Sequence, residues 1–229
     1  MSIFTAETQR AQRNNACPKR FLGAILAIAL INIFAGFPKQ QVFAAPNENR
    51  TSGAFIATVC LDPGHPSENN IGQIAQNGVT ETAVNWKIAL RVKALLKKQK
   101  VAVVLTKKRA DEFVTNKRRA EIANAARADL FLRLHCDTGR GSGITFYYPD
   151  RSGRRRGMRG PSLLIRKRSQ AAARIIHDAA VAKLGPSLKD NGVLGESYTA
   201  LGRKRGALTG SIYAKVPVVL VEMVYLSNK

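Results

Sequence analysis

Short apolar segments alternate with amphipathic ones along this chain, and this alternation constrains the fold more than any other feature. The apolar segments are short enough for buried strands and cover residues 55–61, 101–106, 129–135, 144–148 and 218–222. Residues 80–98, 117–127 and 169–184 carry apolar side chains at helical spacing, with Thr80 and Ser169 as N-caps. Helices that connect apolar strands predict an α/β fold, a three-layer sandwich whose central, largely parallel or mixed sheet is flanked by helices.

Four ionisable residues lie at the ends of these predicted elements. His65 follows the first strand, His135 ends the third strand, Glu222 ends the last strand, and Glu81 begins a helix. Two imidazoles and one carboxylate form a known ligand set of zinc hydrolases, and a second carboxylate fits the general base that such a site needs. These positions predict a zinc hydrolase. The remaining histidine, His177, lies among apolar helix residues, so we expect it to have a packing or surface role.

Residues 59–228 resemble the zinc-dependent N-acetylmuramoyl-L-alanine amidases, the cell-wall amidase family of the cell-division and spore-cortex type. Five pieces in order carry the resemblance: Leu61-Asp62-Pro63-Gly64-His65, Thr80-Glu81 with Asn85, Arg118-Arg119-Ala120 with Ala123-Asn124, Ala128-Asp129-Leu130-Phe131 leading to His135, and Val219-Leu220-Val221-Glu222 with Leu226-Ser227-Asn228. The resemblance implies that His65, Glu81 and His135 bind Zn²⁺ and that Glu222 is the catalytic carboxylate. It also implies a peptidoglycan hydrolase that cleaves the amide between N-acetylmuramic acid and L-alanine with a zinc-activated water.

Two other functions share part of this pattern. A zinc peptidase that cuts within the stem peptide would use the same metal chemistry. A non-catalytic cell-wall-binding protein would use the basic residues alone, and we would then expect Glu222 or a metal ligand to be replaced. The sequence retains all four residues.

The segment around the second histidine departs from the family pattern, because residues 134–137 read Leu-His-Cys-Asp where many relatives have a Ser-Ile-His-x-Asn type of sequence. Side chains two residues apart share a strand face, so Arg133 lies on the face of His135. We predict that Arg133 binds a carboxylate of the stem peptide, with a structural ion pair as the alternative. A second departure is Pro66, which replaces the glycine usual at this position. A third is that relatives continue beyond Lys229, so a C-terminally truncated domain is one interpretation.

The first 44 residues predict a secretory signal peptide, because basic residues precede the apolar run 21–37 and small residues follow it at 42–44. An uncleaved N-terminal membrane anchor is the alternative. Residues 45–54 then form a short linker, and residues 55–229 form a single catalytic domain. We expect an exported protein, in the periplasm or associated with the cell wall.

Basic residues dominate the remaining chain. The full sequence has a formal net charge of +22, and residues 46–229 hold 32 Lys and Arg against 14 Asp and Glu. The excess is densest in residues 151–168, where glycines and the absence of apolar periodicity predict a long exposed loop. The charge excess implies an anionic partner, either cell-wall polymer or lipid headgroups. We predict that this basic loop binds anionic cell-wall polymer, with a merely solvated loop as the alternative. Nucleic acid is not an expected partner, because stacking aromatic residues do not alternate with the basic ones.

Overall fold

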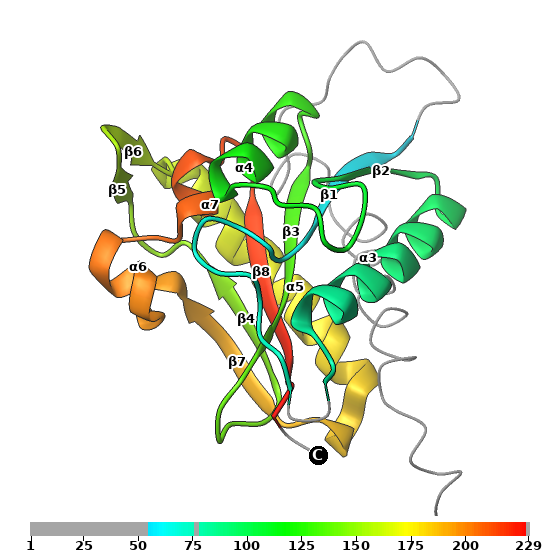
Figure 1. The fold of residues 1–229 in the computed structure, drawn as a ribbon. Helices are drawn as coiled ribbons and strands as arrows, with labels where there is room; N and C mark the ends of the chain where they lie inside the picture. Colours follow the sequence, from blue (N-terminus) through cyan, green and yellow to red (C-terminus); the bar gives the residue numbers. More distant parts are fainter. Residues whose placement is uncertain (1–54, 76–77, 228–229) are drawn as a thin grey trace, which may run out of the picture.

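A computed structural model of the chain describes residues 55–75 and 78–227, and the predicted signal segment and linker lie outside them. At its centre is a six-stranded sheet in the order β2-β1-β3-β8-β4-β7 (Figure 1). The strands are β1 (Ala57–Pro63), β2 (Val101–Leu105), β3 (Leu130–Asp137), β4 (Ile144–Tyr148), β7 (Asp190–Gly195) and β8 (Val218–Tyr225). Strands β2, β1, β3 and β8 are parallel, whereas β4 is antiparallel to β8 and parallel to β7. The predicted α/β sandwich with a mixed sheet is confirmed.

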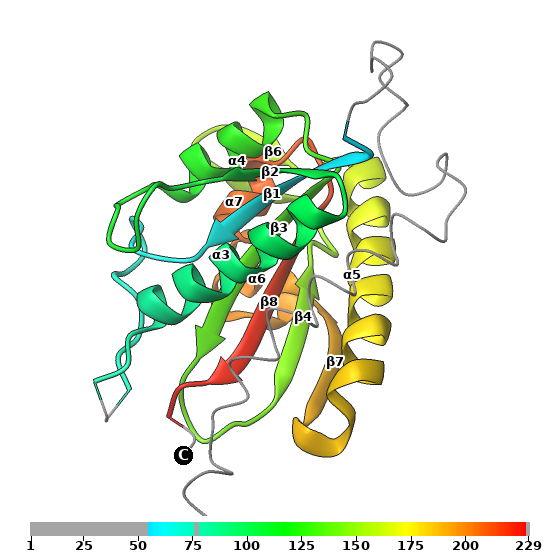
Figure 2. The same ribbon diagram turned by 90° about the vertical axis from the view of Figure 1, so that its right-hand side faces the viewer.

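Helices cover both faces of the sheet. Helices α3 (Glu81–Lys98) and α5 (Leu163–Leu184) pack on one face (Figure 2), and α4 (Asn116–Ala125) packs with the segment that follows α7 (Thr209–Tyr213) on the other. The remaining elements are the hairpin of β5 (Gly153–Arg155) and β6 (Met158–Gly160), helix α6 (Ala200–Arg205), and the 3-10 turns η1 (Gly185–Ser187) and η2 (Glu196–Tyr198). No helix in the part of the chain that the structure describes combines the length and the apolar character needed to cross a membrane.

The N-terminus of α5 differs from the sequence prediction. Ser162 caps the helix by accepting from the backbone N–H of Ile165, so Ser169 is an internal residue. The Ser169 hydroxyl instead donates to the Ile165 carbonyl oxygen (2.7 Å) and accepts from the Val218 N–H (2.9 Å), which ties α5 to the start of β8. The basic residues 166–168 hide the apolar periodicity of the first turns, and this explains the error.

The basic segment 151–168 is also not the long loop that its composition predicts. It forms the β5–β6 hairpin and the first turns of α5. Its glycines allow close packing: a Cβ at Gly153 would lie 2.7 Å from the Ala207 nitrogen, and a Cβ at Gly160 would lie 2.3 Å from the Ile212 carbonyl oxygen. The glycines therefore let the hairpin approach α7 and the residues before it.

Candidate metal centre

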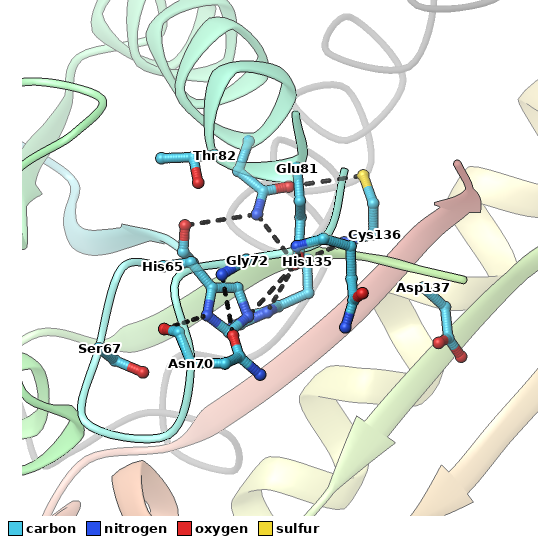
Figure 3. Close-up of polar contacts among 12 residues, drawn as sticks. His65, Ser67, Asn70, Gly72, Glu81, Thr82, His135, Cys136 and Asp137 are labelled. Carbon is cyan, nitrogen blue, oxygen red and sulfur yellow. Dashed lines mark hydrogen bonds and ion pairs between the residues drawn. The ribbon is translucent and has the colours of Figure 1, made fainter. Parts of the chain in front are cut away.

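Three of the predicted site residues meet at the carboxyl edge of the parallel strands (Figure 3). His65 follows β1, His135 lies near the end of β3, and Glu81 is the first residue of α3. Their candidate ligand atoms all lie within 4.8 Å of one another. Glu81 Oε1 is 3.1 Å from His135 Nδ1 and 3.5 Å from His65 Nε2. A single metal ion could therefore contact all three side chains.

The hydrogen bonds and charges around Glu81 and His65 set their protonation states. The Glu81 carboxylate accepts from the backbone N–H groups of Gln73 (3.0 Å) and Cys136 (3.2 Å). Burial opposes ionisation of Glu81, but the hydrogen bond and charge of His135 and the charge of His65 outweigh it and lower the pKa of Glu81 to about 2. Burial and the neighbouring His135 lower the pKa of His65 to about 4. At neutral pH, Glu81 is thus anionic and His65 neutral, and these are the forms that bind metal.

His135 provides a test of whether the residues fit a metal. Its Nε2 atom is buried and has no hydrogen-bond partner among residues 55–75 and 78–227. Such unsatisfied buried nitrogens are rare in folded proteins, and a metal ion bound by the imidazole would account for this one. The ring lies directly over the backbone of Gly64, because a Cβ at that position would be 2.3 Å from His135 Cε1. The arrangement fits a divalent metal such as Zn²⁺.

Two buried cations hold the turn that carries His65. Lys107 Nζ donates to the carbonyl oxygens of residues 64 (3.4 Å) and 65. Arg119 donates to the carbonyl oxygens of residues 63 and 66, each at 2.9 Å. Every carbonyl from residue 63 to residue 66 therefore accepts from one of the two side chains. His65 has a φ of 56°, a left-handed conformation that is uncommon for a residue other than glycine, and these bonds stabilise it.

Glu222 lies on β8 directly opposite His135 of β3 in the register of the sheet. Residues paired in this way direct their side chains to the same face. The Oε2 atom of Glu222 is buried and has no hydrogen-bond partner within the described segments. Burial, followed by the charges of Glu81 and Asp137, raises the pKa of Glu222 well above its ordinary value. A carboxyl group with a raised pKa beside a metal centre fits proton transfer at neutral pH.

Comparison with known proteins identifies the family. Residues 59–229 match the family described as N-acetylmuramoyl-L-alanine amidase. The chain belongs to this amidase family. It is 30% identical over 174 residues to the N-acetylmuramoyl-L-alanine amidase LytC of Bacillus subtilis (strain 168), a match that covers 75% of this chain and 30% of LytC. It is 29% identical over 174 residues to the endolysin of Bacillus phage SPP1, covering 75% of this chain and 55% of the endolysin.

Solved structures of amidases share the fold. The N-acetylmuramoyl-L-alanine amidase AmiC2 of Nostoc punctiforme superposes with a TM-score of 0.59 at 24% identity, covering 77% of this chain and 84% of AmiC2. The amidase Ami1 of Mycobacterium smegmatis gives a TM-score of 0.60 at 22% identity, covering 75% of this chain and 83% of Ami1. The chain thus matches most of each solved structure, whereas it spans only about a third to a half of LytC and the endolysin.

Arg133 forms the structural ion pair that was the alternative to its predicted role in binding a carboxylate of the stem peptide. Its side chain is buried, with Nε 2.9 Å from Asp62 Oδ2 and Nη2 2.6 Å from Asn116 Oδ1. Arg133 pairs with Asp62 in the register of β1 and β3, so its guanidinium reaches that buried carboxylate before it can reach the metal centre. The structural ion pair, the alternative interpretation, is the one observed. The signal that could have revealed it is Asp62 itself, an acid inside an apolar strand.

The two cysteines of the amidase fold lie on opposite faces of the sheet. Cys60 of β1 packs on the side of α4, and Cys136 of β3 packs on the side of α3. Both are thiols, and no disulfide joins them. Burial and the nearby charge of Asp62 raise the pKa of the Cys60 thiol, so this residue does not provide a thiolate ligand. The candidate metal ligands of the site are the two imidazoles and the carboxylate.

Proposed function

We propose that this chain is a zinc-dependent N-acetylmuramoyl-L-alanine amidase, which hydrolyses the amide between the lactyl group of N-acetylmuramic acid and L-alanine of the stem peptide in peptidoglycan. The observation that carries the proposal is the cluster of His65, Glu81 and His135 within 4.8 Å, in which His135 Nε2 is buried without a partner among the described residues. Membership of the amidase family supports the choice of substrate.

In the proposed mechanism, His65, Glu81 and His135 would hold Zn²⁺, which would supply polarisation of the scissile carbonyl and a lower pKa of the attacking water. Glu222 accepts the proton of that water and passes it to the leaving amine nitrogen. The raised pKa of Glu222 suits this role, because it makes the carboxylate a stronger base towards the water than an ordinary carboxylate. Lys107 and Arg119 fix the turn of His65, so this imidazole needs little rearrangement on binding metal.

Product analysis tests the reaction. Purified peptidoglycan digested by the zinc-loaded protein is expected to yield glycan with free muramyl lactyl groups and intact peptides that begin with L-alanine. Shortened stem peptides that remain attached to glycan would instead identify a zinc peptidase. Binding to peptidoglycan without any released product would identify a non-catalytic wall-binding protein.

Two substitutions separate metal binding from proton transfer. His135→Ala should remove zinc and activity together. Glu222→Gln should retain zinc and lower turnover by a factor of about 100 or more, which corresponds to roughly 3 kcal/mol in the activation barrier. Glu121→Gln is a matched control on the exposed surface of α4 and should change neither. Loss of zinc from Glu222→Gln would mean that Glu222 is a ligand and that the roles of the two glutamates must be revised.

We further propose that the protein is exported, with residues 1–44 acting as a signal peptide or, if uncleaved, as a membrane anchor. The order of basic, apolar and small residues in that segment supports the proposal. Export would also expose the basic segment 151–168 to an anionic partner, either wall polymer or lipid headgroups. Cell fractionation combined with N-terminal sequencing of the mature protein tests export and cleavage. A full-length protein in the cytoplasm would contradict the proposed export.

A further inference from the structure

Cations gather at the end of the molecule opposite the metal centre. We call this end the amino edge: the described segments 55–57, 97–101, 126–130, 151–164 and 214–218, most of which lead into the parallel strands. Because β4 runs against β8, its carboxyl end also lies at this edge and continues into the β5–β6 hairpin, on the upper side of Figure 1. The exposed cations of the amino edge are Lys97, Lys98, Lys100, Arg127, Arg151, Arg154, Arg156, Arg159 and Lys215.

The charge of the amino edge is nearly all of one sign. Its five segments contain ten Lys and Arg residues and one acid, Asp129, and a second acid, Asp150, directly precedes residue 151 and pairs with Arg151 (3.6 Å). Asp129 is buried, and its carboxylate accepts from the Thr58 N–H (2.8 Å). The loops at the opposite edge, residues 64–80, 106–115, 137–143 and 185–190, contain five basic and five acidic residues. The fold therefore concentrates positive charge at the end remote from the metal centre.

Apolar side chains accompany these cations. Phe55, Ile56, Met158, Leu163 and Leu164 belong to the amino edge, and each is between 47% and 57% exposed. A soluble polyanion is attracted by the charge alone. Basic residues interspersed with exposed apolar ones instead fit a lipid surface, where the cations meet anionic headgroups and the apolar groups enter the boundary of the acyl chains.

The place of Phe55 at the start of the described chain supports the same partner. Phe55 begins the described part of the chain just before β1, at the amino edge. The apolar run 21–37 precedes it by fewer than twenty residues in the sequence. If that run is retained as an anchor, the chain leads from the membrane into this edge of the domain.

We propose that the amino edge docks on an anionic phospholipid surface and turns the metal centre away from the membrane. His135 lies five residues beyond the start of β3 at Leu130, which places it about 17 Å from the amino edge at about 3.3 Å per residue. That separation is about twice the Debye length of about 8 Å at physiological ionic strength, so neutralising exposed cations at the edge should change the metal centre little. This proposal goes beyond the amidase reaction and does not depend on it.

Vesicle sedimentation of the full chain tests the proposal. The partition coefficient is measured on vesicles of phosphatidylcholine with and without phosphatidylglycerol, and the ratio of the two values isolates the dependence on anionic lipid. The N-terminal segment contributes equally to every variant, so it cancels when variants are compared. Each Lys or Arg near the surface strengthens binding roughly fivefold. The triple variant Arg154→Gln, Arg156→Gln and Arg159→Gln should therefore lower the ratio by roughly a hundredfold.

A matched triple variant controls for net charge. Lys108, Arg140 and Lys189 are exposed cations on loops at the opposite edge. Their replacement by Gln changes the net charge of the protein by the same amount and should lower the ratio by less than about threefold. Equal losses in the two triple variants would overturn the proposal, because binding would then follow total charge and not the amino edge.

The exposed leucines distinguish a lipid surface from a polymer. The double variant Leu163→Ser and Leu164→Ser should weaken binding to the anionic vesicles about tenfold and leave binding to soluble poly(glycerol phosphate) unchanged. Unchanged vesicle binding in this variant would overturn the lipid assignment in favour of anionic polymer. Hydrolysis of a soluble muropeptide provides the independent measurement. It should be equal in the wild type and in the two amino-edge variants, and its absence from the wild type would contradict the proposed amidase function without affecting the vesicle result.

Discussion

Replacing Asp62 with Asn should destabilise the domain more than almost any other single change of charge. Asp62 is fully buried in β1, and its carboxylate accepts from Arg119 Nη1 (2.5 Å), Arg133 Nε (2.9 Å) and Thr106 Oγ1 (2.6 Å). The two arginines are also buried. Asn has nearly the same shape but no charge, so the substitution leaves two buried guanidinium groups without their shared anion.

The magnitude follows from the cost of an uncompensated buried charge. Removing one member of a buried ion pair typically costs about 3–5 kcal/mol. Hydrogen bonds from Arg119 to backbone carbonyls offset part of that cost, so we expect the free energy of unfolding to fall by about 4 kcal/mol. The matched control is Asp111→Asn, which breaks the exposed pair with Arg109, whose side chains are 74% and 79% exposed. Exposed pairs contribute about 0–1 kcal/mol.

Urea unfolding at pH 7 measures both changes, with an unchanged m-value as the condition for comparing them. Burial alone would raise the pKa of Asp62, but the charges of Arg119 and Arg133 outweigh it and hold the pKa below its ordinary value. A depressed folded-state pKa gives stability that is complete above the unfolded pKa of about 3.9 and is lost as the pH falls through the folded value. The difference between wild type and variant should thus be constant from pH 7 to pH 5 and shrink in stronger acid. A loss at pH 7 no larger than that of Asp111→Asn would refute the reasoning.

Two further substitutions test the site and one interaction remote from it. Gly64→Ala introduces a Cβ into the space of the His135 ring. We expect the affinity for zinc, measured by competition with a chelating dye, to fall at least tenfold, as for other changes next to metal ligands. An unchanged affinity would show that the imidazole can move without penalty. His177 of α5 is held by Asp190 (3.0 Å), and although its partial burial favours the neutral form, its hydrogen bonds to Asp178 and Asp190 raise its pKa. A raised folded-state pKa gives stability that is complete below the ordinary value of about 6.5 and is lost as the pH rises through the folded value. His177→Asn should therefore lower the free energy of unfolding by up to about 1 kcal/mol at pH 5.5 and by almost nothing at pH 9. An equal cost at both pH values in urea unfolding would exclude the charged histidine as the cause.

Sequence patterns predicted the positions of the site residues better than the ends of the elements. His65 follows β1 and Glu81 follows the N-cap Thr80, as predicted, and periodicity also placed His135 and Glu222 in the second halves of their strands. The predicted end of the last strand at Glu222 is wrong, because β8 continues to Tyr225. These predictions depend on local periodicity and on the rule that parallel strands share their carboxyl edge.

Features that depend on contacts between distant segments could not be predicted in this way. The hairpin at 153–160 exists because its glycines fit against residues near Ala207 and Ile212, about fifty residues away, and no local pattern encodes that fit. The sequence shows the strand face of Arg133 but not its counterion, and for this reason it predicts a role in substrate binding. Its pairing with Asp62 depends on the register between β1 and β3, which the sequence alone does not specify.

The hydrogen bonds around His65 also determine when during folding the candidate metal centre can form. The carbonyl groups of residues 63–66 are held by Lys107 and Arg119, which lie 42 to 56 residues further along the chain. The loop after β2 and helix α4 must therefore dock before the first imidazole is fixed. A chain that is only partly folded would bind zinc weakly, and zinc affinity would serve as a measure of completed tertiary structure. In the exported hydrolase that we propose, this order would keep catalytic activity from appearing until the domain has reached its final form.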